Sequence, residues 1–312
     1  MFTNLRTKKV WTILTAMLAS MFLLAGCGGG SGGQQAQPEK KQVVGLSIST
    51  LNNPFFVDLK EGAEAAAKAA NIELVVMDAQ NDASKQMANI ENLIEKKVNV
   101  IIVNPVDSKA IVSAVEAANK ANIPVITVDR GAEGGKIVSA IASDNVAGGK
   151  MAGQYIVDKL GGKGKVVELE GVPGTSAAND RGKGFNEAIK AAAGISVVAK
   201  QPADFDRAKG MKVMENILQA NPEIQAVFAH NDEMALGALE AIKAANRTGV
   251  MVVGFDANAD AVKAVNEGTL AATVAQKPKD MGKIAIETSL KVIKGETVQP
   301  AIPVALELVV KK

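Results

Sequence analysis

Several chemically reactive residue types are nearly missing from this chain of 312 residues. It contains one cysteine, one histidine, one tryptophan and one tyrosine. A single histidine leaves little material for a nucleophile–base pair, and the sequence has neither a phosphate-binding loop ending in Gly-Lys-Ser/Thr nor a cluster with metal-ligand spacing. These shortages argue against an enzyme, and they predict neither a cofactor nor a metal.

A strong excess of one charge is also missing. The chain has 35 Lys and Arg against 33 Asp and Glu, and three of the basic residues precede Cys27. Setting those three aside leaves 32 basic against 33 acidic residues, a net charge of −1. Binding to nucleic acid needs a clearly basic surface, so this balance predicts no nucleic-acid partner.

The single cysteine follows a segment with the layout of a secretory signal. Residues 1–26 begin with a basic stretch, continue through the uncharged apolar run Val10–Leu24, and end in small residues before Cys27. The alternative is a short transmembrane anchor, but this run of about 15 residues is shorter than the ~20 that span a bilayer. We therefore expect residues 1–26 to be a signal peptide and Cys27 to be acylated.

A flexible tether is expected after the acylated cysteine, over residues 27–41. Its sequence after Cys27, GGGSGGQQAQPEKK, cannot bury apolar surface. Acyl chains on Cys27 would anchor the protein on the extracytoplasmic side, at the outer face of the cytoplasmic membrane or in a periplasm. No cysteine remains beyond Cys27, so the fold that begins near Gln42 relies on its apolar cores without disulfides.

Beyond Gln42, short β-branched apolar runs alternate with alanine-rich stretches of helical pattern. The predicted strands are Val43–Ile48, Leu74–Met77, Val100–Val103, Val125–Val128, Val166–Leu169, Ile195–Ala199, Ala226–Ala229, Val250–Phe255 and Ala271–Ala275. The predicted helices include Leu59–Ala70, Ser84–Lys96 and Ser108–Ala121. Nearly continuous apolar strands separated by helices indicate parallel sheets covered on both faces. About 270 residues suffice for two such units, so we predict an α/β fold of two doubly wound, Rossmann-like parallel-sheet domains.

Two polar pairs suggest that the halves of the chain are copies of one unit. Asn104 and Asp129 end successive predicted strands of the first half. Asn231 and Asp256 end corresponding strands of the second half with the same spacing, so one constant offset in numbering carries the first pair onto the second. The repeat predicts two similar sheets with polar groups at the carboxyl ends of their strands.

The same offset pairs positions near the first two strands of each half, Pro54 with Arg181 and Asp78 with Phe205. Arg181 and Phe205 would then stand at the carboxyl edge of the second sheet. In open parallel sheets this edge is where ligands bind. Two such edges facing one another would form a cleft.

Aromatic residues are scarce, which makes the pair Phe55-Phe56 informative. Beyond Cys27 the chain has no tryptophan, one tyrosine and six phenylalanines. Phe55 and Phe56 follow Asn53 and Pro54 in a polar loop at the expected ligand-facing edge. A flat ring against the C–H face of a sugar is a common element of carbohydrate sites. The alternative is that Asn53 only caps the helix and that both rings join the core.

Polar side chains end the remaining strands, and each taken alone could be a helix cap or a turn residue. Together they offer carboxylates that accept, amides that donate and accept, and arginine forks that donate twice, which matches adjacent sugar hydroxyls. The set is Asn104, Asp129, Arg130, Arg181, Asn231, Asp256 and Gln276. Five or six charge-assisted hydrogen bonds of about 1.5–3 kcal/mol each, less their desolvation, would support micromolar binding or better.

Eight segments resemble the ribose-binding members of the bacterial periplasmic sugar-binding protein family, over the length from about Val43 to Lys311. They read STLNNPFF, IVNPVDS, IPVITVDR, IASDN, GTSAANDRGKGF, QPADFDRAKG, NDEMALGAL and VMVVGFD. His230 departs from the pattern expected of the family, and we assign it no role. The predicted acylation site and tether differ from soluble members and suggest a membrane-anchored version.

The resemblance implies a type I periplasmic-binding-protein fold and a set of sugar contacts. From the first domain these would be Asn53, Phe55, Phe56, Asn104, Asp129 and Arg130, with Ser49 as a lesser candidate. From the second domain or the hinge they would be Arg181, Phe205, Asn231, Asp256 and Gln276. Phe205 would stack on the ring face opposite the Phe55 and Phe56 side.

The resemblance also implies how the domains are divided and how they work. One domain would comprise residues 42–143 and 277–304, and the other residues 144–276 and 305–312. Three crossings of the chain, near Ser143, Gln276 and Val304, would join them as a hinge. D-ribose touching both domains would bind the closed state more tightly and shift the population toward it. The membrane subunits of an ABC importer would then recognise the closed form of a monomeric receptor.

Other protein classes and other ligands remain open at this point. A transcription repressor of similar fold would carry a helix-turn-helix at its amino end, where this chain has a signal segment. A receptor for allose, galactose or a furanosyl signalling molecule would look similar, and it could serve chemotaxis through a chemoreceptor as well as transport. Glucose and galactose relatives usually stack the sugar on a tryptophan and carry an Asp-rich calcium loop, and neither feature occurs here.

Overall fold

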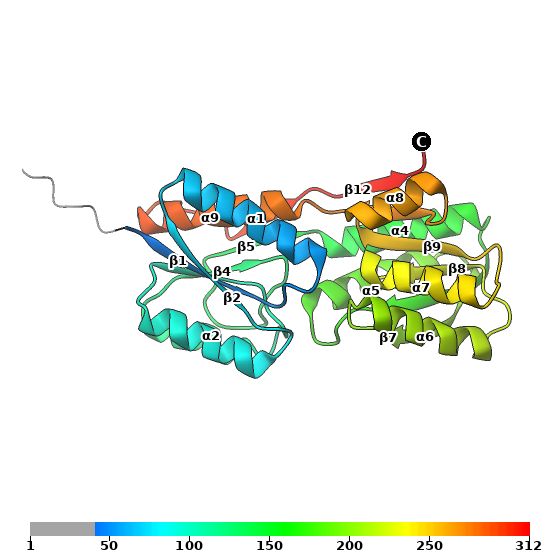
Figure 1. Cartoon of the computed structure of the whole chain (residues 1–312), viewed down its shortest axis with the longest axis horizontal. Coiled ribbons are helices and arrows are strands. Elements are labelled where there is room, and N and C mark those ends of the chain that lie inside the picture. Colours follow the sequence, from blue (N-terminus) through cyan, green and yellow to red (C-terminus); the bar gives the residue numbers. More distant parts are fainter. Residues whose placement is uncertain (1–40) are drawn as a thin grey trace, which may run out of the picture. The chain divides into compact units, whose positions relative to one another are not determined.

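The computed structural model describes residues 41–312, and many of its helices and strands are labelled in Figure 1. The predicted signal peptide, residues 1–26, and the predicted acylated Cys27 with its tether up to residue 40 lie outside the described residues. Residues 41–312 form two six-stranded sheets, each packed against helices on both faces. This arrangement confirms the predicted α/β fold with two mainly parallel sheets.

The first sheet takes its strands from two separate parts of the chain. Its spatial order is β11-β5-β4-β3-β1-β2, and all neighbouring strands run parallel. These strands are β1 (Val43–Ile48), β2 (Glu73–Asp78), β3 (Val100–Val103), β4 (Val125–Val128), β5 (Ser139–Ser143) and β11 (Ala301–Val304). Its helices are α1 (Pro54–Ala69), α2 (Ala83–Glu95), α3 (Val112–Lys120) and α9 (Pro278–Ile293).

The second sheet has the order β12-β10-β9-β8-β6-β7, in which only β12 runs antiparallel to its neighbour. Its strands are β6 (Lys163–Glu170), β7 (Gly194–Pro202), β8 (Ala226–Ala229), β9 (Met251–Asp256), β10 (Ala272–Ala275) and β12 (Glu307–Val310). Its helices are α4 (Asn145–Lys159), α5 (Ser176–Lys190), α6 (Arg207–Ala220), α7 (Asp232–Ala244) and α8 (Ala259–Glu267). We call the first sheet with its helices lobe 1 and the second lobe 2.

The two sheets repeat one topology. In each, the second strand of the unit lies at one edge, the first strand beside it, and the third, fourth and fifth strands follow in order. The chain passes from one sheet to the other after β5, after β10 and after β11. Within each sheet, the parallel strands have their carboxyl ends at the same edge, and the loops that follow these strands gather there.

Each sheet buries alternate side chains on opposite faces, as a strand period of two requires. Leu46 and Ile102 pack under α1 and α9, whereas Ile101 and Val103 pack under α2 and α3. Each fully buried aliphatic side chain of this kind contributes about 1.5–3 kcal/mol through the hydrophobic effect. Figure 1 shows α1 and α9 lying side by side over one face of the first sheet.

Three strands were not predicted from the sequence. Strand β5 reads SAIAS, with small and polar residues in place of an apolar run, and β11 carries Pro303. Proline is tolerated there because β11 is an edge strand, where a missing N–H interrupts no central ladder. The antiparallel pairing of β12 with β10 also departs from the purely parallel sheets that were predicted.

Helix α3 begins at Val112, later than the predicted start at Ser108. The carboxylate of Asp107 accepts hydrogen bonds from the backbone N–H groups of Lys109 (2.8 Å) and Ala110 (2.7 Å). The next bond, from the N–H of Val112 to the carbonyl of Lys109 (3.1 Å), spans three residues as in a tight turn, so the regular α-helix starts only at Val112.

The predicted constant offset between the halves holds for the third and fourth strands but not for the first. Asn104 directly follows β3, and Asn231 is the second residue after β8, so the offset fits there to within one residue. Pro54 is the first residue of α1, however, whereas Arg181 lies in the second turn of α5. The loops before these two helices, residues 49–53 and 171–175, are equally long, so the extra residues of the second half lie between the start of α5 and the start of β8, and one constant offset cannot relate both ends of the unit.

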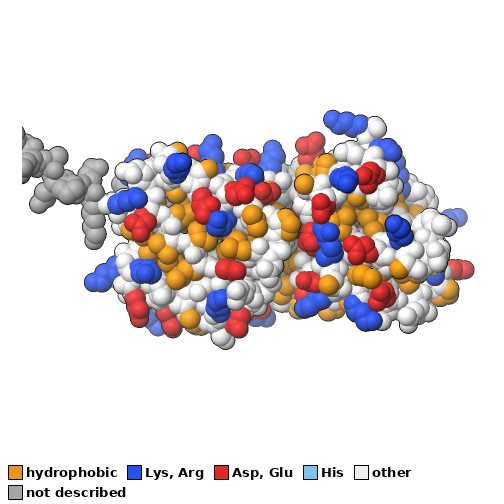
Figure 2. Space-filling model, in the orientation of Figure 1, with side chains coloured by type: hydrophobic (Ala, Val, Ile, Leu, Met, Phe, Trp, Pro, Cys, Tyr) orange, Lys and Arg blue, Asp and Glu red, His pale blue; other side chains and the backbone are white. Residues whose placement is uncertain are grey.

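Charges of both signs are interspersed over the face shown in Figure 2. Many of them form surface ion pairs, such as Lys60 with Glu64 (2.8 Å) and Lys165 with Glu223 (2.9 Å). Exposed pairs of this kind add at most about 1 kcal/mol each. Over residues 41–312, no helix is both long enough and apolar enough to cross a membrane.

Candidate functional site

A small cavity lies between the carboxyl edges of the two sheets, with an empty volume of about 240 Å³. Residues of both lobes line it, from the carboxyl ends of strands, the loops that follow them and the first turns of α1 and α5. They are Asn53, Phe55, Phe56, Asp129, Arg130, Ala177, Arg181, Phe205, Asn231, Asp256 and Gln276. Ten of these eleven residues are sugar contacts implied by the family resemblance, and Ala177 is the addition.

The start of α1 places the two phenylalanines of lobe 1. Asn53 caps this helix by accepting a hydrogen bond from the backbone N–H of Phe55 (2.9 Å), and Pro54 supplies the first helical residue. Phe55 and Phe56 are both buried, with their ring centroids 5.2 Å apart and their planes at 88°. Each ring therefore belongs both to the apolar core and to the wall of the cavity.

Asp129 and Arg130 follow β4 and form a buried charged pair. The carboxylate of Asp129 lies 3.7 Å from Nε of Arg130, whose Nη1 donates to the backbone carbonyl of Pro105 (3.1 Å). Burial raises the pKa of Asp129, and the charges of Arg130 and Arg181 oppose that rise. Burial also lowers the pKa of Arg130 to about 10. The pair presents an acceptor and a planar donor to the cavity from the lobe 1 side.

Asn104 lies behind this pair and does not line the cavity. Its amide nitrogen donates to a carboxylate oxygen of Asp129 and to the carbonyl of Val128, both at 3.1 Å. Its amide oxygen accepts from the backbone N–H of Ser49 (3.2 Å). Asn104 is fully buried, and Ser49 is buried beside it. The structure therefore places both residues where they orient Asp129 and the loop after β1.

Arg181 projects from α5 and is held by three groups of lobe 2. Its Nε donates to Oδ1 of Asn145 (2.8 Å), its Nη1 donates to the backbone carbonyl of His230 (2.7 Å), and it lies 3.7 Å from Asp256. The guanidinium also stacks on the ring of Phe255, with 3.9 Å to the centroid. Burial lowers the pKa of Arg181, and the acidic residues around it oppose the shift.

Asp256 is the last residue of β9, Gln276 directly follows the neighbouring β10, and the two side chains meet in the cavity. Nε2 of Gln276 donates to Oδ1 of Asp256 at 2.8 Å. Burial raises the pKa of Asp256 to about 7, even though Arg181 and the Gln276 amide favour its charged form. Oε1 of Gln276 and Nε of Arg130 are buried polar atoms without a hydrogen-bond partner in the part of the chain that the structure describes. Such atoms are expected where a polar ligand supplies the partner.

Phe205 and Asn231 close the lobe 2 side. Oδ1 of Asn231 caps α7 by accepting from the N–H of Met234 (3.0 Å), and its amide nitrogen donates to the carbonyl of Phe205 (3.3 Å). The ring of Phe205 lies between two guanidinium groups, 5.3 Å from that of Arg130 and 5.7 Å from that of Arg181. The ring of Phe205 thus lines the cavity next to the guanidinium donors of Arg130 and Arg181.

Three of the cavity residues have backbone conformations that side chains rarely adopt. Asp129, Phe205 and Asp256 have φ values of +64°, +59° and +117°. Strain of this kind costs on the order of 1–3 kcal/mol per residue, and it persists where the surrounding structure enforces it. Its concentration at one cavity supports a functional role for these positions.

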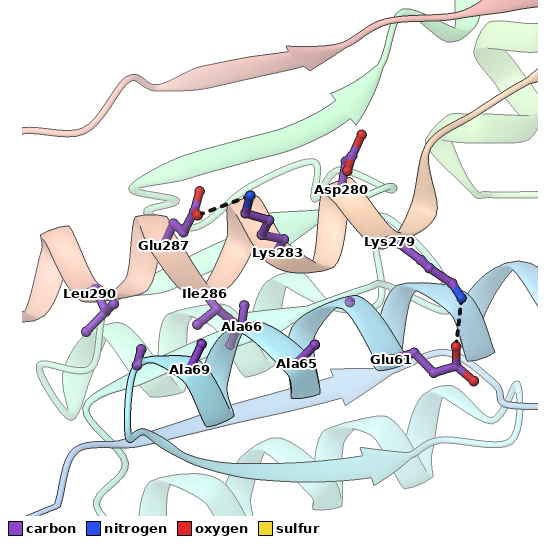
Figure 3. A pocket seen from close by; sticks show the side chains of 12 residues that line it. Glu61, Ala65, Ala66, Ala69, Lys279, Asp280, Lys283, Ile286, Glu287 and Leu290 are labelled. Atoms are coloured by element: carbon purple, nitrogen blue, oxygen red, sulfur yellow. Dashed lines mark ion pairs between the residues drawn. The ribbon is translucent and has the colours of Figure 1, made fainter.

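Larger hollows lie elsewhere, and the groove between α1 and α9 is one that is mainly apolar. Its empty volume is about 1300 Å³, and it is lined by Ala65, Ala66, Ala69, Ile286 and Leu290, with charges at its rim. Figure 3 shows two of its ion pairs, Lys279 with Glu61 and Lys283 with Glu287, satisfied by one another. Among residues 41–312, no group of three His, Cys, Asp or Glu side chains is placed to hold a metal ion.

Ala177 is the one lining residue that the sequence did not indicate. It lies in the first turn of α5, and its buried methyl group faces the cavity. Nothing distinguishes it in the sequence from the other alanines of the helices. The strand-end polar residues could be found because they interrupt apolar runs.

Known proteins resemble this chain over nearly its whole described length. The sequence profile described as "Periplasmic binding protein domain" matches residues 44–297. The Ribose import binding protein RbsB of Escherichia coli is 55% identical over 272 residues, which is 87% of this chain and 92% of that protein. The Ribose import binding protein RbsB of Bacillus subtilis is 50% identical over 310 residues, covering 98% of this chain and 99% of the relative.

Solved structures agree with the fold. A periplasmic solute-binding protein of an ABC transporter from Actinobacillus succinogenes, with bound D-allose, superimposes with a TM-score of 0.82 and 35% identity. The match covers 87% of this chain and 98% of that structure. Together with the profile and the two relatives, it confirms the resemblance inferred from the sequence: the chain belongs to the family of periplasmic binding protein domains.

Proposed function

We propose that this chain is the extracytoplasmic substrate-binding protein of an ABC sugar importer and that it binds D-ribose between its two lobes. The observation that carries the proposal is the cavity of about 240 Å³, in which charged, amide and aromatic side chains of both lobes converge. Two relatives with half or more of their residues identical to this chain are ribose import binding proteins.

The chemistry of the lining suits a small polyol with two apolar faces. Asp129 and Asp256 accept hydrogen bonds, Arg130 and Arg181 donate them, and the amide of Gln276 can do both. Each charge-assisted bond contributes about 1.5–3 kcal/mol before desolvation. The phenylalanine rings of the two lobes would cover the C–H faces of the sugar. Ribose would thereby find a partner for each hydroxyl and for each face.

We propose that the lobes act as rigid bodies of a hinged receptor, residues 42–143 with 277–304 and residues 144–276 with 305–312. The sheet order supports this division, because the chain changes sheets after Ser143, after Ala275 and after Val304. Ribose contacting both lobes would bind the closed form more tightly and shift the population toward it by that differential affinity. Closure would then signal occupancy to the membrane subunits of the importer.

We further propose that Cys27 carries the lipid anchor and that the receptor acts as a monomer. Support comes from the signal-like residues 1–26, the small residues before Cys27, and the polar glycine-rich stretch that follows. Stable anchoring takes more than one acyl chain. A chemoreceptor would be a second partner able to recognise the closed form.

Isothermal titration calorimetry with D-ribose, D-allose, D-xylose, D-galactose and D-glucose tests the proposed ligand. We expect ribose to bind at micromolar affinity or better and each of the others to bind at least about tenfold more weakly, a difference of about 1.4 kcal/mol. Tightest binding of another sugar would refute ribose, and no heat with any sugar would refute the sugar site.

D-allose is the second candidate because a structural neighbour holds it. That neighbour is 35% identical to this chain, whereas the two ribose import binding proteins are 50% and 55% identical. Allose differs from ribose by one added hydroxymethyl carbon, so the size of the closed cavity decides between them. The sugar panel separates the two directly.

A further inference from the structure

His230 is a fully buried residue that does not line the cavity, yet both nitrogens of its ring are hydrogen-bonded to strand β6 or to the residue that follows it. It directly follows β8, and its Nε2 lies 3.0 Å from Oε1 of Glu168 on β6. Its Nδ1 accepts a hydrogen bond from the backbone N–H of Gly171 (3.3 Å), which follows the end of β6. The imidazole therefore links the end of β8 to the end of β6.

The surroundings of Glu168 fix the protonation state of this link. The amide nitrogen of Asn186 donates to Oε2 of Glu168 (2.9 Å), and Nζ of Lys200 lies 3.5 Å from the same oxygen. Burial raises the pKa of Glu168, but the bonds from His230 and Asn186 and the charge of Lys200 outweigh burial and lower it overall. Glu168 is therefore ionised and accepts a proton donor at each oxygen. The His230 ring is then neutral, with its hydrogen on Nε2 and the lone pair of Nδ1 toward Gly171.

Two cavity residues, Phe205 and Arg181, contact the backbone groups of Gly171 and His230. The backbone of Gly171 packs directly against the ring of Phe205, so closely that a Cβ at Gly171 would clash with the ring carbons. The backbone carbonyl of His230 accepts the hydrogen bond from Nη1 of Arg181 (2.7 Å). A shift of the imidazole would thus move both the support of Phe205 and the acceptor that orients Arg181.

We propose that His230 is a positioning residue of the sugar site: bonded between Glu168 and the Gly171 backbone, it fixes Phe205 and Arg181 from behind the cavity. The proposal rests on the proposed function and adds a residue to it that touches no sugar. It also accounts for the position at which the chain departs from the pattern expected of its family.

The pH dependence of ribose binding distinguishes a hydrogen-bonded His230 from one that only fills space. Burial lowers the pKa of His230, and Glu168 opposes the shift. The charged groups that face the ring are Glu168 and Glu170 from β6, with Lys200 of β7 behind Glu168, and Arg181 from α5. A protonated ring would carry a hydrogen on Nδ1, which would oppose the N–H of Gly171 as donor against donor. Protonation therefore breaks the link on the Gly171 side.

Two variants separate the link from mere packing. His230→Gln keeps an oxygen that can accept from Gly171 and an amide that can donate to Glu168, but it cannot titrate. His230→Leu removes both hydrogen bonds. Tyr155→Phe is the matched control, because it deletes one hydrogen bond of lobe 2, to the carbonyl of Ala271 (3.1 Å), by a residue that does not line the cavity.

The experiment is calorimetric titration with D-ribose at pH 7.5 and pH 5.5, with thermal melting of each sugar-free variant. At pH 7.5 we expect about tenfold weaker binding for His230→Leu and at most about twofold weaker binding for His230→Gln and Tyr155→Phe. At pH 5.5 the wild type and Tyr155→Phe should bind several-fold more weakly than at pH 7.5, by a factor that His230→Gln lessens.

The results that would overturn the proposal are distinct from those that would overturn the proposed function. A folded His230→Leu variant that binds ribose as the wild type does, even with a lowered melting temperature, shows a structural role alone. If His230→Leu does not fold, an equal acid loss in His230→Gln and in the wild type overturns the proposal instead. A wild type that binds another sugar of the panel refutes ribose only, and the variants are then compared with that sugar. No binding of any sugar overturns both.

Discussion

The guanidinium of Arg181 combines a structural and a binding role in one side chain. Within lobe 2 it bonds to Asn145 of α4 and to the carbonyl of His230, and it stacks on Phe255. These contacts use Nε and Nη1, which leaves Nη2 for a ligand. A planar fork with five donors can do this, whereas a lysine offers a single charged centre.

We predict that Arg181→Lys weakens ribose binding by at least about tenfold and that Arg181→Ala also lowers the stability of the sugar-free protein by about 1–3 kcal/mol. The alanine variant leaves Asp256 buried beside a lost partner, while the lysine variant keeps a charge there. Calorimetry and denaturant unfolding of the sugar-free protein measure the two effects separately. Wild-type affinity in Arg181→Lys would show that the fork makes no contact with the sugar.

Asp256 makes a prediction about pH. Its pKa of about 7 in the sugar-free protein lies above the ordinary value of 3.8, so the sugar-free protein loses stability as pH rises through that window. Sugar hydroxyls donating to the carboxylate favour its ionised form. Ribose binding should therefore release protons below about pH 7, and the affinity should rise with pH and level off above it.

Calorimetry at pH 6.5 in phosphate and in Tris measures this release, because the two buffers take up a proton with different enthalpies. We expect the apparent binding enthalpy to differ between the buffers for the wild type and to agree for Asp256→Asn. Equal enthalpies in both buffers for the wild type would contradict proton release. Burial lowers the pKa of His230, which favours the neutral form of its ring.

At the scale of elements, two pairs of helices pack closely through glycines. A Cβ on Gly62 of α1 would clash with the backbone of Lys279 in α9, and a Cβ on Gly149 of α4 would clash with the carbonyl of Arg181 in α5. Both positions lie on helix crossings where only a hydrogen atom fits. The crossing of α4 and α5 differs in that it supports a cavity residue.

We predict that Gly62→Ala and Gly149→Ala each destabilise the sugar-free protein by about 1–3 kcal/mol through overpacking. Only Gly149→Ala should also weaken ribose binding, by several-fold, because it displaces the backbone that carries Arg181. Melting temperatures and ribose titrations of the two variants test this difference. Equal ribose affinities in both variants would mean that the α4–α5 crossing does not set the position of Arg181.

The sequence predicts an element well where one local rule determines it. Strands β3, β4 and β8 begin and end where predicted, because their apolar runs stop at a polar residue. Strands β5, β11 and β12 could not be recognised, since they are short, partly polar or at a sheet edge, and tertiary pairing defines them. The cavity shows the same division. Strand-end residues such as Asp129 and Asp256 are visible as interruptions, whereas Phe205 was indicated only by the offset between the halves and by the resemblance. Asn104 lies behind the cavity.

At the scale of the whole molecule, the predicted anchor lies outside the described residues and needs its own test. We predict that the full chain incorporates labelled fatty acid when it is expressed in a bacterium and fractionates with membranes. Cys27→Ala should carry no label and should be released from the membrane fraction. Ribose binding by the released variant should match that of the wild type, since the residues that line the cavity all lie within residues 41–312. Label retained by Cys27→Ala would refute acylation at this residue.

Three hydrogen bonds join the two lobes directly at the start of α5, and in the proposed hinged receptor they belong to the closed form. At the start of α5, the N–H of Ser176 donates to Oγ of Ser108 (3.0 Å), and Oγ of Ser176 accepts from the N–H of Gly131 (2.9 Å). The N–H of Ser108 donates to the carbonyl of Gly174 (3.0 Å). Ser108 and Gly131 belong to lobe 1, and Gly174 and Ser176 belong to lobe 2. Opening would break all three bonds and expose their groups to water.

We predict that Ser176→Ala weakens ribose binding about two- to tenfold, because one hydrogen bond of the closed form, worth about 0.5–1.5 kcal/mol, is lost. The loss should appear as faster ribose dissociation in stopped-flow measurements, since the bond forms only after the lobes meet. Ser113→Ala is the control, because its hydroxyl bonds within lobe 1, to the carbonyl of Ala110. Dissociation rates that are equal in Ser176→Ala and Ser113→Ala would show that the contact between the lobes adds nothing to the stability of the closed form.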